Sequence, residues 1–340
     1  MTLKKCFFLL FVSSSLFSVH LSGQSFRSKH ISAEEEKQLE KHQDSLTRYA
    51  YDIINAQEPS QRFRADSFFI RMLVRSLKLP NSFYFPFDSL QTISKLYAPD
   101  SSFRIFTWQI KKDAYVFFQR GAIQMRTDDG SLKLFPLHDV SMFSKKPYDS
   151  VRTANNWIGA IYYRIIQKSF NGKNMYTLLG YDDFTINSNK KWMDILTFNE
   201  QGQPVFGGNY FSFKNDSAKA SKKQIQRFYL EYKKEATTTF NYDSTLQMIV
   251  FDHLISETDE PERKETYIPD GDFEGFKWKD GQWGDDLGNL TGAHLPDLGI
   301  ALSVDPDNIA RWIAAADPGE MTLPCDMPFG AHLSDHRQAV

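Results

Sequence analysis

The feature that most constrains the fold is a period of two in the apolar residues between Phe87 and Glu257. Short runs rich in Phe, Tyr, Ile, Val and Thr alternate there with turn sequences such as DDG, NGK, EQGQ and YDST. Successive side chains of a β-strand point to opposite faces, so each of these runs predicts a strand. Turns this short leave no room for a crossover helix, and consecutive strands must therefore pair antiparallel.

The runs together predict a long antiparallel meander of about nine to eleven strands. They are SFRIFTWQI, AYVFFQRGAIQMR, WIGAIYYRIIQKSF, MYTLLGY, WMDILTF, PVFGGNYFSF, QIQRFYLEY, ATTTFNY and LQMIVFDHL. A meander of that size tends to become a curled sheet, a half-barrel or a sandwich. An irregular β-propeller is the alternative, although no repeat of steady period is visible. YVFF and IYYRII carry large apolar residues on both faces, so we expect these strands to be covered on both sides.

Residues 25–81 precede the strands and predict a hairpin of two helices. Ser32, with Glu35 three residues later, forms a capping-box signature, and apolar residues follow at helical spacing. The sequence EPS then interrupts the pattern before a second apolar stripe begins, and so short a break folds the second helix back on the first. We therefore expect an α+β fold, mainly β, in which this hairpin packs on the antiparallel sheet of residues 82–283.

The N-terminal residues 1–24 have the layout of a secretory signal peptide. Lys4 and Lys5 precede an apolar run from Cys6 to Phe17, and small polar residues follow it. The run is much shorter than the roughly 20 residues that cross a bilayer as a helix. No later run is long enough either, so we expect no transmembrane segment. The sequence predicts export to the periplasm or the extracellular space.

The last part of the chain, residues 284–340, differs sharply in composition from what precedes it. It contains no Lys or Tyr and only one Phe, and its net charge is −7. Because the whole chain carries −2 and the signal segment +2, the body between them is left near +3. This small excess is spread along the chain among acids, so we do not expect nucleic-acid binding.

Several runs of the body occur together in a recognisable order. They are SFYFPFDSLQTISKLYAPDSSFRIFTW, GAIQM followed by LKLFPLHD, YTLLGYDDF, DILTFNEQGQPVFG, MIVFDHL and YIPDGDFEGFKWKDGQW. Over about residues 82–283 the chain resembles a family of exported, uncharacterised proteins of the Bacteroidetes. The resemblance implies an exported protein, and it brings no assigned activity, cofactor or catalytic residue.

The tail weakly resembles a different family. Its runs GNLTGAHLPDLG, DPDNIARWIAAADPGEM and MPFGAHLSDHRQAV are similar, in order, to the C-terminal half of a class I cytochrome c. The resemblance implies that Met327 is an axial haem ligand in an electron-transfer fusion. Covalent haem attachment needs C-x-x-C-H, however, and the chain lacks that motif and its proximal His. His332 and His336, at i and i+4, form a metal-ligand pair without a third member. We interpret the tail as truncated or chimeric.

The body contains few groupings that favour catalysis. It has no G-x-S-x-G motif, and its histidines lie far apart along the chain. An envelope hydrolase would have to use acids such as Asp182, Asp252 or Asp270 with His253 as the base. This hypothesis requires at least two of these side chains to meet in one cleft. Asp182 and Asp183 are neighbours, which point to opposite faces of a strand, so they are not expected to form a glycosidase pair.

The stretch DGDFEG is the candidate metal site. Asp270, Asp272 and Glu274 alternate there, and Gly275 falls where a calcium-binding loop turns sharply. The twelfth position of such a loop is Gly281 instead of Glu, and no helix is predicted after it. The alternative to a calcium site is a tight turn between strands whose acids face water.

Aromatic residues near the end of the body form the candidate ligand site. Phe273, Phe276, Trp278 and Trp283 would make a platform for a sugar or a peptide, because flat rings stack on apolar faces. The alternative is that they belong to the core of a terminal strand. We therefore expect a non-enzymatic, exported β-rich protein that binds an apolar ligand or an envelope partner. The alternatives are the envelope hydrolase and the haem-binding fusion, and calcium and haem are the only cofactors that the sequence raises.

Overall fold

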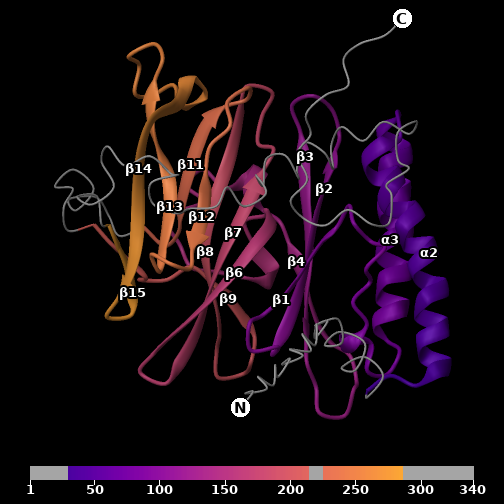
Figure 1. Ribbon diagram of the computed structural model, residues 1–340. Helices are drawn as coiled ribbons and strands as arrows, with labels where there is room; N and C mark the ends of the chain where they lie inside the picture. Colours follow the sequence, from indigo (N-terminus) through magenta and orange to yellow (C-terminus); the bar gives the residue numbers. More distant parts are fainter. Residues whose placement is uncertain (1–29, 214–224, 286–340) are drawn as a thin grey trace, which may run out of the picture.

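The computed structural model describes residues 30–213 and 225–285, and it contains a pair of helices followed by three sheets in chain order (Figure 1). The predicted α+β fold, mainly β and with an N-terminal helical hairpin, is confirmed. The predicted signal segment 1–24 and nearly all of the tail lie outside the described residues. The last strand runs two residues into the tail, because it ends at Asp285.

The two helices are α2 (Ala33–Asn55) and α3 (Pro59–Leu77). α2 begins at the predicted capping box: the Ser32 backbone N–H donates to Glu35 Oε2 at 2.9 Å, and the Glu35 N–H donates to Ser32 Oγ at 3.3 Å. These bonds satisfy N–H groups that the first helical turn leaves unpaired. Pro59 is favoured at the first position of α3, where no N–H is needed. The local signals therefore set both helix starts.

Each sheet is built mainly from consecutive strands. The first sheet contains β1 (Ser94–Tyr97), β2 (Phe103–Lys111), β3 (Phe117–Met125) and β4 (Lys133–His138). The middle sheet contains β5 (Arg152–Thr153), β6 (Ile161–Phe170), β7 (Lys173–Asp182), β8 (Ser188–Phe198), β9 (Pro204–Phe206) and β11 (Phe228–Lys233). The last sheet contains β10 (Phe211–Ser212), β12 (Phe240–Asp243), β13 (Met248–Ser256), β14 (Tyr267–Lys279) and β15 (Gln282–Asp285). Short 3-10 turns η1 (Ser82–Tyr84), η2 (Ser141–Phe143), η3 (Ala154–Asn156) and η4 (Lys264–Thr266) connect them.

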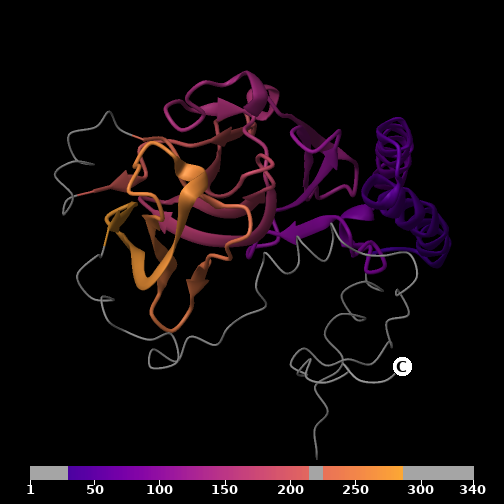
Figure 2. The same cartoon turned by 90° about the horizontal axis from the view of Figure 1, so that it is seen from above.

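The helices and the three sheets stack in the order in which the chain forms them (Figures 1 and 2). One apolar core lies between the helices and the first sheet, a second between the first and middle sheets, and a third between the middle and last sheets. On β2, Phe106, Trp108 and Ile110 belong to the first core, whereas Phe103 and Ile105 belong to the second. Alternation along this strand thus supplies both cores. The run YVFF, which was expected to be covered on both sides, begins before β3, and its Tyr115 is 68% exposed.

The antiparallel meander is confirmed, but its strands form three separate sheets rather than one continuous sheet. The predicted strand PVFGGNYFSF contains two short strands, β9 and β10, which belong to different sheets. Gly207 and Gly208 lie between them with φ of 83° and 144°, where residues with a side chain are strained. These glycines let the chain leave the middle sheet, and β10 then pairs parallel with β15.

Arg104, on β2, is buried to 1% exposure without any carboxylate partner among the described residues. Its Nε donates to Gln124 Oε1 at 2.7 Å, its Nη2 to the Ser82 carbonyl at 2.8 Å and its Nη1 to Tyr97 Oη at 2.9 Å. The rings of Phe83, Phe87, Tyr97 and Phe106 lie 4.8 to 5.8 Å from its Cζ. Burial lowers the pKa of this guanidinium. The arginine ties the segment after α3 to the first sheet.

We predict that Arg104→Met lowers the free energy of unfolding by about 2–4 kcal/mol, because several buried acceptors lose their donor. Arg126→Met, which changes an exposed arginine after β3, should alter it by less than about 0.5 kcal/mol. Urea denaturation of both variants measures the difference. Equal stabilities for the two variants would show that the guanidinium contributes nothing beyond its volume.

Candidate functional site

The aromatic residues of the predicted ligand platform do not share an exposed face. Phe276 and Trp283 are buried in the core between the middle and last sheets, where Trp283 Nε1 donates to Thr177 Oγ1 at 2.9 Å. Trp278 is partly buried against the same core, whereas Phe273 packs elsewhere, in the small cluster around Met248 and Val250. The prediction of an open platform is therefore wrong for Phe276 and Trp283. Both are core residues because β14 and β15 turn this face toward the middle sheet.

The predicted calcium-binding acids lie on a strand rather than in a loop. Asp270, Asp272 and Glu274 belong to β14, and Gly275, expected to form the sharp turn, sits opposite Val250 in the ladder. No three His, Cys, Asp or Glu side chains of residues 30–213 and 225–285 are placed to hold a metal ion. A strand spreads these acids along its length, which a calcium loop does not do.

Two of the four acid–base candidates meet. His253 Nδ1 lies 2.8 Å from Asp270 Oδ2, next to a β-bulge between β13 and β14, and both side chains are partly exposed. Burial acts to raise the pKa of Asp270, but the hydrogen bonds from His253 and the Asp272 N–H outweigh it and lower that pKa. Asp252 is buried and accepts from Thr238 Oγ1 at 3.1 Å. The expected convergence is thus limited to one His–Asp pair.

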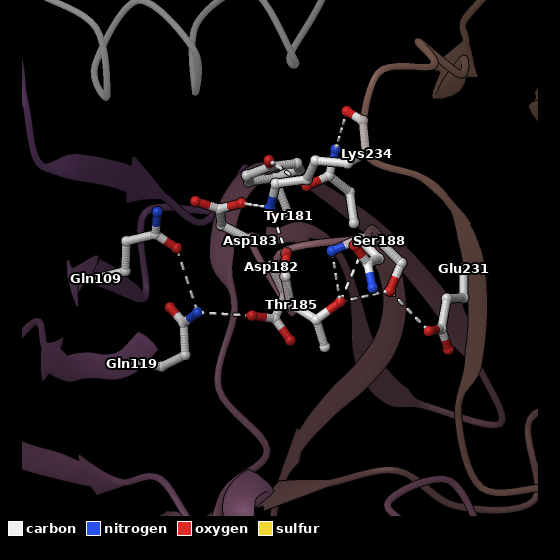
Figure 3. Close-up of polar contacts among 11 residues, drawn as sticks. Gln109, Gln119, Tyr181, Asp182, Asp183, Thr185, Ser188, Glu231 and Lys234 are labelled. Carbon is white, nitrogen blue, oxygen red and sulfur yellow. Dashed lines mark hydrogen bonds and ion pairs between the residues drawn. The ribbon is translucent and has the colours of Figure 1, made fainter. Parts of the chain in front are cut away.

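Asp182 belongs to a buried polar network between the first and middle sheets (Figure 3). Its Oδ1 accepts from Gln119 Nε2 at 2.8 Å, and the same Nε2 lies 3.4 Å from Gln109 Oε1. Burial raises the pKa of Asp182 to about 6, and the charge of Asp139 adds to this rise, while Lys190 opposes it. The carboxyl group therefore links the end of β7 to β3 at a site where its charged form is disfavoured.

Two ion pairs lie near this carboxylate at the β7–β8 turn, and Figure 3 shows one of them, between Asp183 and Lys234. Lys190 Nζ lies 3.4 Å from Glu231 Oε2 and 3.2 Å from the centre of the Phe184 ring. Burial lowers the pKa of Lys190, although Glu231 and Asp182 counteract the effect. Asp183 points away from Asp182 to an ion pair with Lys234, as expected for neighbours along a strand. The cluster joins β8, β11 and the turn, and its members are held mainly by one another.

A surface cavity of about 490 Å³ lies in the segment between β4 and β5. This segment leaves the sheet at Asp139, whose Oδ1 accepts from the N–H groups of Ser141 at 2.9 Å and Gly159 at 3.0 Å. The cavity is lined by Val140, Phe143, Ser144, Lys145, Lys146, Asp149 and Arg152. Asp139 thus ties the start of this loop to the segment that follows β5.

The cavity combines positive charge with exposed apolar surface. Lys145, Lys146 and Arg152 outnumber Asp149 in its lining, and Phe143 is 85% exposed. Arg152 Nη2 donates to Ser144 Oγ at 2.8 Å, whereas its buried Nε has no hydrogen-bond partner in the described part of the chain. Burial and the charge of nearby Arg227 lower the pKa of Arg152. An anion in this cavity would relieve the repulsion between these cations.

Arg227 lies behind the cavity and is completely buried. Its Nε donates to Asp194 Oδ2 at 3.1 Å, and its Nη1 donates to the carbonyl of Ser150 at 3.2 Å. It therefore holds the loop on the middle sheet. The cationic loop was not found from the sequence, where the run SMFSKKPYDSVR has no periodicity and resembles an ordinary polar connection. The one sequence feature that could have indicated this loop is the closeness of the apolar residues MF to the basic residues KK in a long segment between predicted strands.

No family model, curated protein or solved structure matches the chain. Over residues 30–213 and 225–285, neither α-helix has the length and apolar character that crossing a bilayer demands. Met327, His332 and His336, the candidate ligands of the tail, lie outside the described residues. The cavity and the polar network are therefore identified from their geometry and charge.

Asp182 should make stability depend on pH. Its folded-state pKa of about 6 exceeds an unfolded value near 3.9, so its stabilising contribution is present below about pH 4 and is lost as the pH rises through about 6. We compare the free energy of unfolding of Asp182→Asn with that of the natural protein. We predict that this difference shifts in favour of the variant by about 2 kcal/mol when the pH rises from 4 to 7. Urea denaturation at both pH values measures this.

The exposed acid Asp128 offers the matched control. Asp128→Asn should differ from the natural protein by the same small amount at both pH values, because this side chain is exposed to water in the folded chain as it is in the unfolded one. Parallel pH profiles for Asp182→Asn and the natural protein would contradict the prediction.

Proposed function

We propose that this is an exported, non-enzymatic binding protein whose ligand is a small amphiphilic anion. The single observation that carries the proposal is the cavity beside Phe143, in which three cations face one acid. Export is supported by residues 1–24, which have a basic start, an apolar run and small polar residues. The resemblance to an exported Bacteroidetes family supports the same location.

The chemistry of the cavity selects the ligand class. Lys145, Lys146 and Arg152 supply hydrogen-bond donors that suit a carboxylate or a phosphate, and such charge-assisted bonds are stronger than neutral ones. Phe143 and Val140 supply apolar contact, and Phe143 is the most exposed large apolar side chain of the described residues. A ligand with an anionic head and a short apolar chain satisfies both parts. The purely apolar ligand that the sequence predicts would leave the cations unpaired.

A binding role accounts for the site better than catalysis does. His253 and Asp270 pair on an exposed part of the last sheet, whereas the cavity lies against the middle sheet. Neither member of this pair lines the cavity, so the strongest acid–base geometry and the best candidate ligand site are separate. An enzyme needs its acid–base groups within hydrogen-bond reach of the bound substrate.

We predict that decanoate binds more tightly than decanol, which has the same chain length and no charge. Replacing Lys145→Gln and Lys146→Gln together should weaken decanoate binding by roughly tenfold and leave decanol unchanged, because only the anion loses a partner. Isothermal titration calorimetry of the full chain measures both affinities.

The matched control removes another adjacent lysine pair, through Lys111→Gln and Lys112→Gln at the end of β2, where both lysines are exposed. These changes alter the net charge equally but lie outside the cavity lining, so the affinity for decanoate should stay within about twofold of the natural protein if long-range charge contributes little. Equal weakening by the two pairs, or no binding of decanoate, would contradict the proposed site.

A further inference from the structure

A row of cationic side chains runs along the outer side of α3. Arg64, Phe68, Arg71, Arg75 and Lys78 follow one another at alternating spacings of four and three residues. On a helix this spacing keeps side chains on one face, and each of the five is exposed. We call these residues the α3 row. It is separate from the cavity, which lies in the segment between β4 and β5.

Helix α3 offers the α3 row no exposed acid. The acid of α3, Asp66, is buried and accepts from Trp108 Nε1 at 2.8 Å. The four cations of the row take part in no ion pair with residues 30–213 or 225–285. Arg71 and Arg75 are four residues apart, and like charges at that spacing destabilise a helix. A bound anion would remove this penalty.

Phe68 organises the centre of the row. The guanidinium carbons of Arg64 and Arg71 lie 5.7 and 4.8 Å from the centre of its ring, and Tyr49 of α2 stacks on it with centroids 5.5 Å apart. Ring contacts of this kind hold a guanidinium group without using its N–H donors. No hydrogen-bond acceptor among the described residues takes those donors from Arg64 or Arg71. The two groups are held in position and keep their donors available.

The shape of this part of the molecule suits a flat partner. α2 and α3 form one outer layer of the stack, at the edge of the molecule in both views (Figures 1 and 2). The row covers 15 residues from Arg64 to Lys78, and its two ends are roughly 21 Å apart along the helix axis. The exposed side of a helix is a ridge, which can touch a planar surface along its whole length.

We propose that the α3 row docks this protein on a bilayer surface that contains anionic lipid. The arginine donors and Lys78 contact lipid phosphates, and Phe68 lies at the level of the headgroups, where aromatic rings are favoured. Helix α3 stays packed on the first sheet through its buried face, so docking is peripheral and needs no rearrangement of the core. The interaction weakens with salt, because it depends on exposed charges.

Vesicle co-sedimentation of the full chain tests the proposal. The measured quantity is the ratio of affinity for phosphatidylglycerol–phosphatidylcholine vesicles to affinity for pure phosphatidylcholine vesicles. This ratio cancels any contact of the N-terminal apolar run with lipid chains. We expect Arg71→Gln with Arg75→Gln to lower the ratio roughly thirtyfold, since each cation near an anionic surface contributes roughly fivefold.

A matched pair of changes on the same hairpin serves as the control. Lys37→Gln with Lys41→Gln removes two exposed cations of α2 that lie off the row, and it should change the ratio by less than about threefold. Circular dichroism melting shows whether each variant keeps its fold. An equal loss in both variants, a ratio near one for the natural protein, or unchanged binding after the α3 changes would overturn the proposal. So would binding of soluble polyglutamate through these arginines without binding of vesicles.

Discussion

Burial of both faces of the first and middle sheets is the constraint on which the rest of this structure depends. Phe106 and Phe103 illustrate it, because they lie on one strand and enter two different cores. Neither face of a sheet enclosed in this way is exposed to solvent. Polar groups on its strands must therefore form hydrogen bonds or ion pairs with other groups of the protein. Arg104 donates to a backbone carbonyl group and packs against aromatic rings, Arg227 forms an ion pair with Asp194, and Asp182 accepts a hydrogen bond from Gln119. Of these bonds, the one between Asp182 and Gln119 joins the middle sheet to the first sheet.

The same constraint moves binding chemistry to the periphery. The cores between the layers are filled by large side chains such as Trp157 and Trp283, which are fully buried. Exposed cationic and apolar side chains lie together on the loop around Phe143 and on the outer side of α3. We propose an anionic amphiphile for the first surface and an anionic bilayer for the second. A protein that carries such ligands near a membrane would use both surfaces, and each proposal can fail without the other.

The parts of the fold that depend on local sequence were predictable, and the parts that depend on distant contacts were not. Ser32 and Glu35 form the capping box within one turn, so the sequence alone located the start of α2. Division into three sheets depends on where Gly207 and Gly208 redirect the chain, and a strand pattern does not reveal that. The sequence predicted Trp283 to be part of a ligand platform. The alternation of apolar and polar residues shows neither which strand pairs with this one nor which sheet covers its face. The signal peptide, the cytochrome c-like tail and the resemblance to an exported Bacteroidetes family stay predictions.

The order of the layers has a consequence for how the chain can assemble. Helices, first sheet, middle sheet and most of the last sheet follow one another in space as they do in sequence. A polypeptide that is synthesised from its N-terminus can therefore fold most of each layer before the next one is made. Each new layer then packs on a layer that has already formed. Only the closing pairs, such as β10 with β15, must wait until β15 has been made. Such vectorial assembly limits the time for which the doubly apolar strands stay uncovered and open to aggregation.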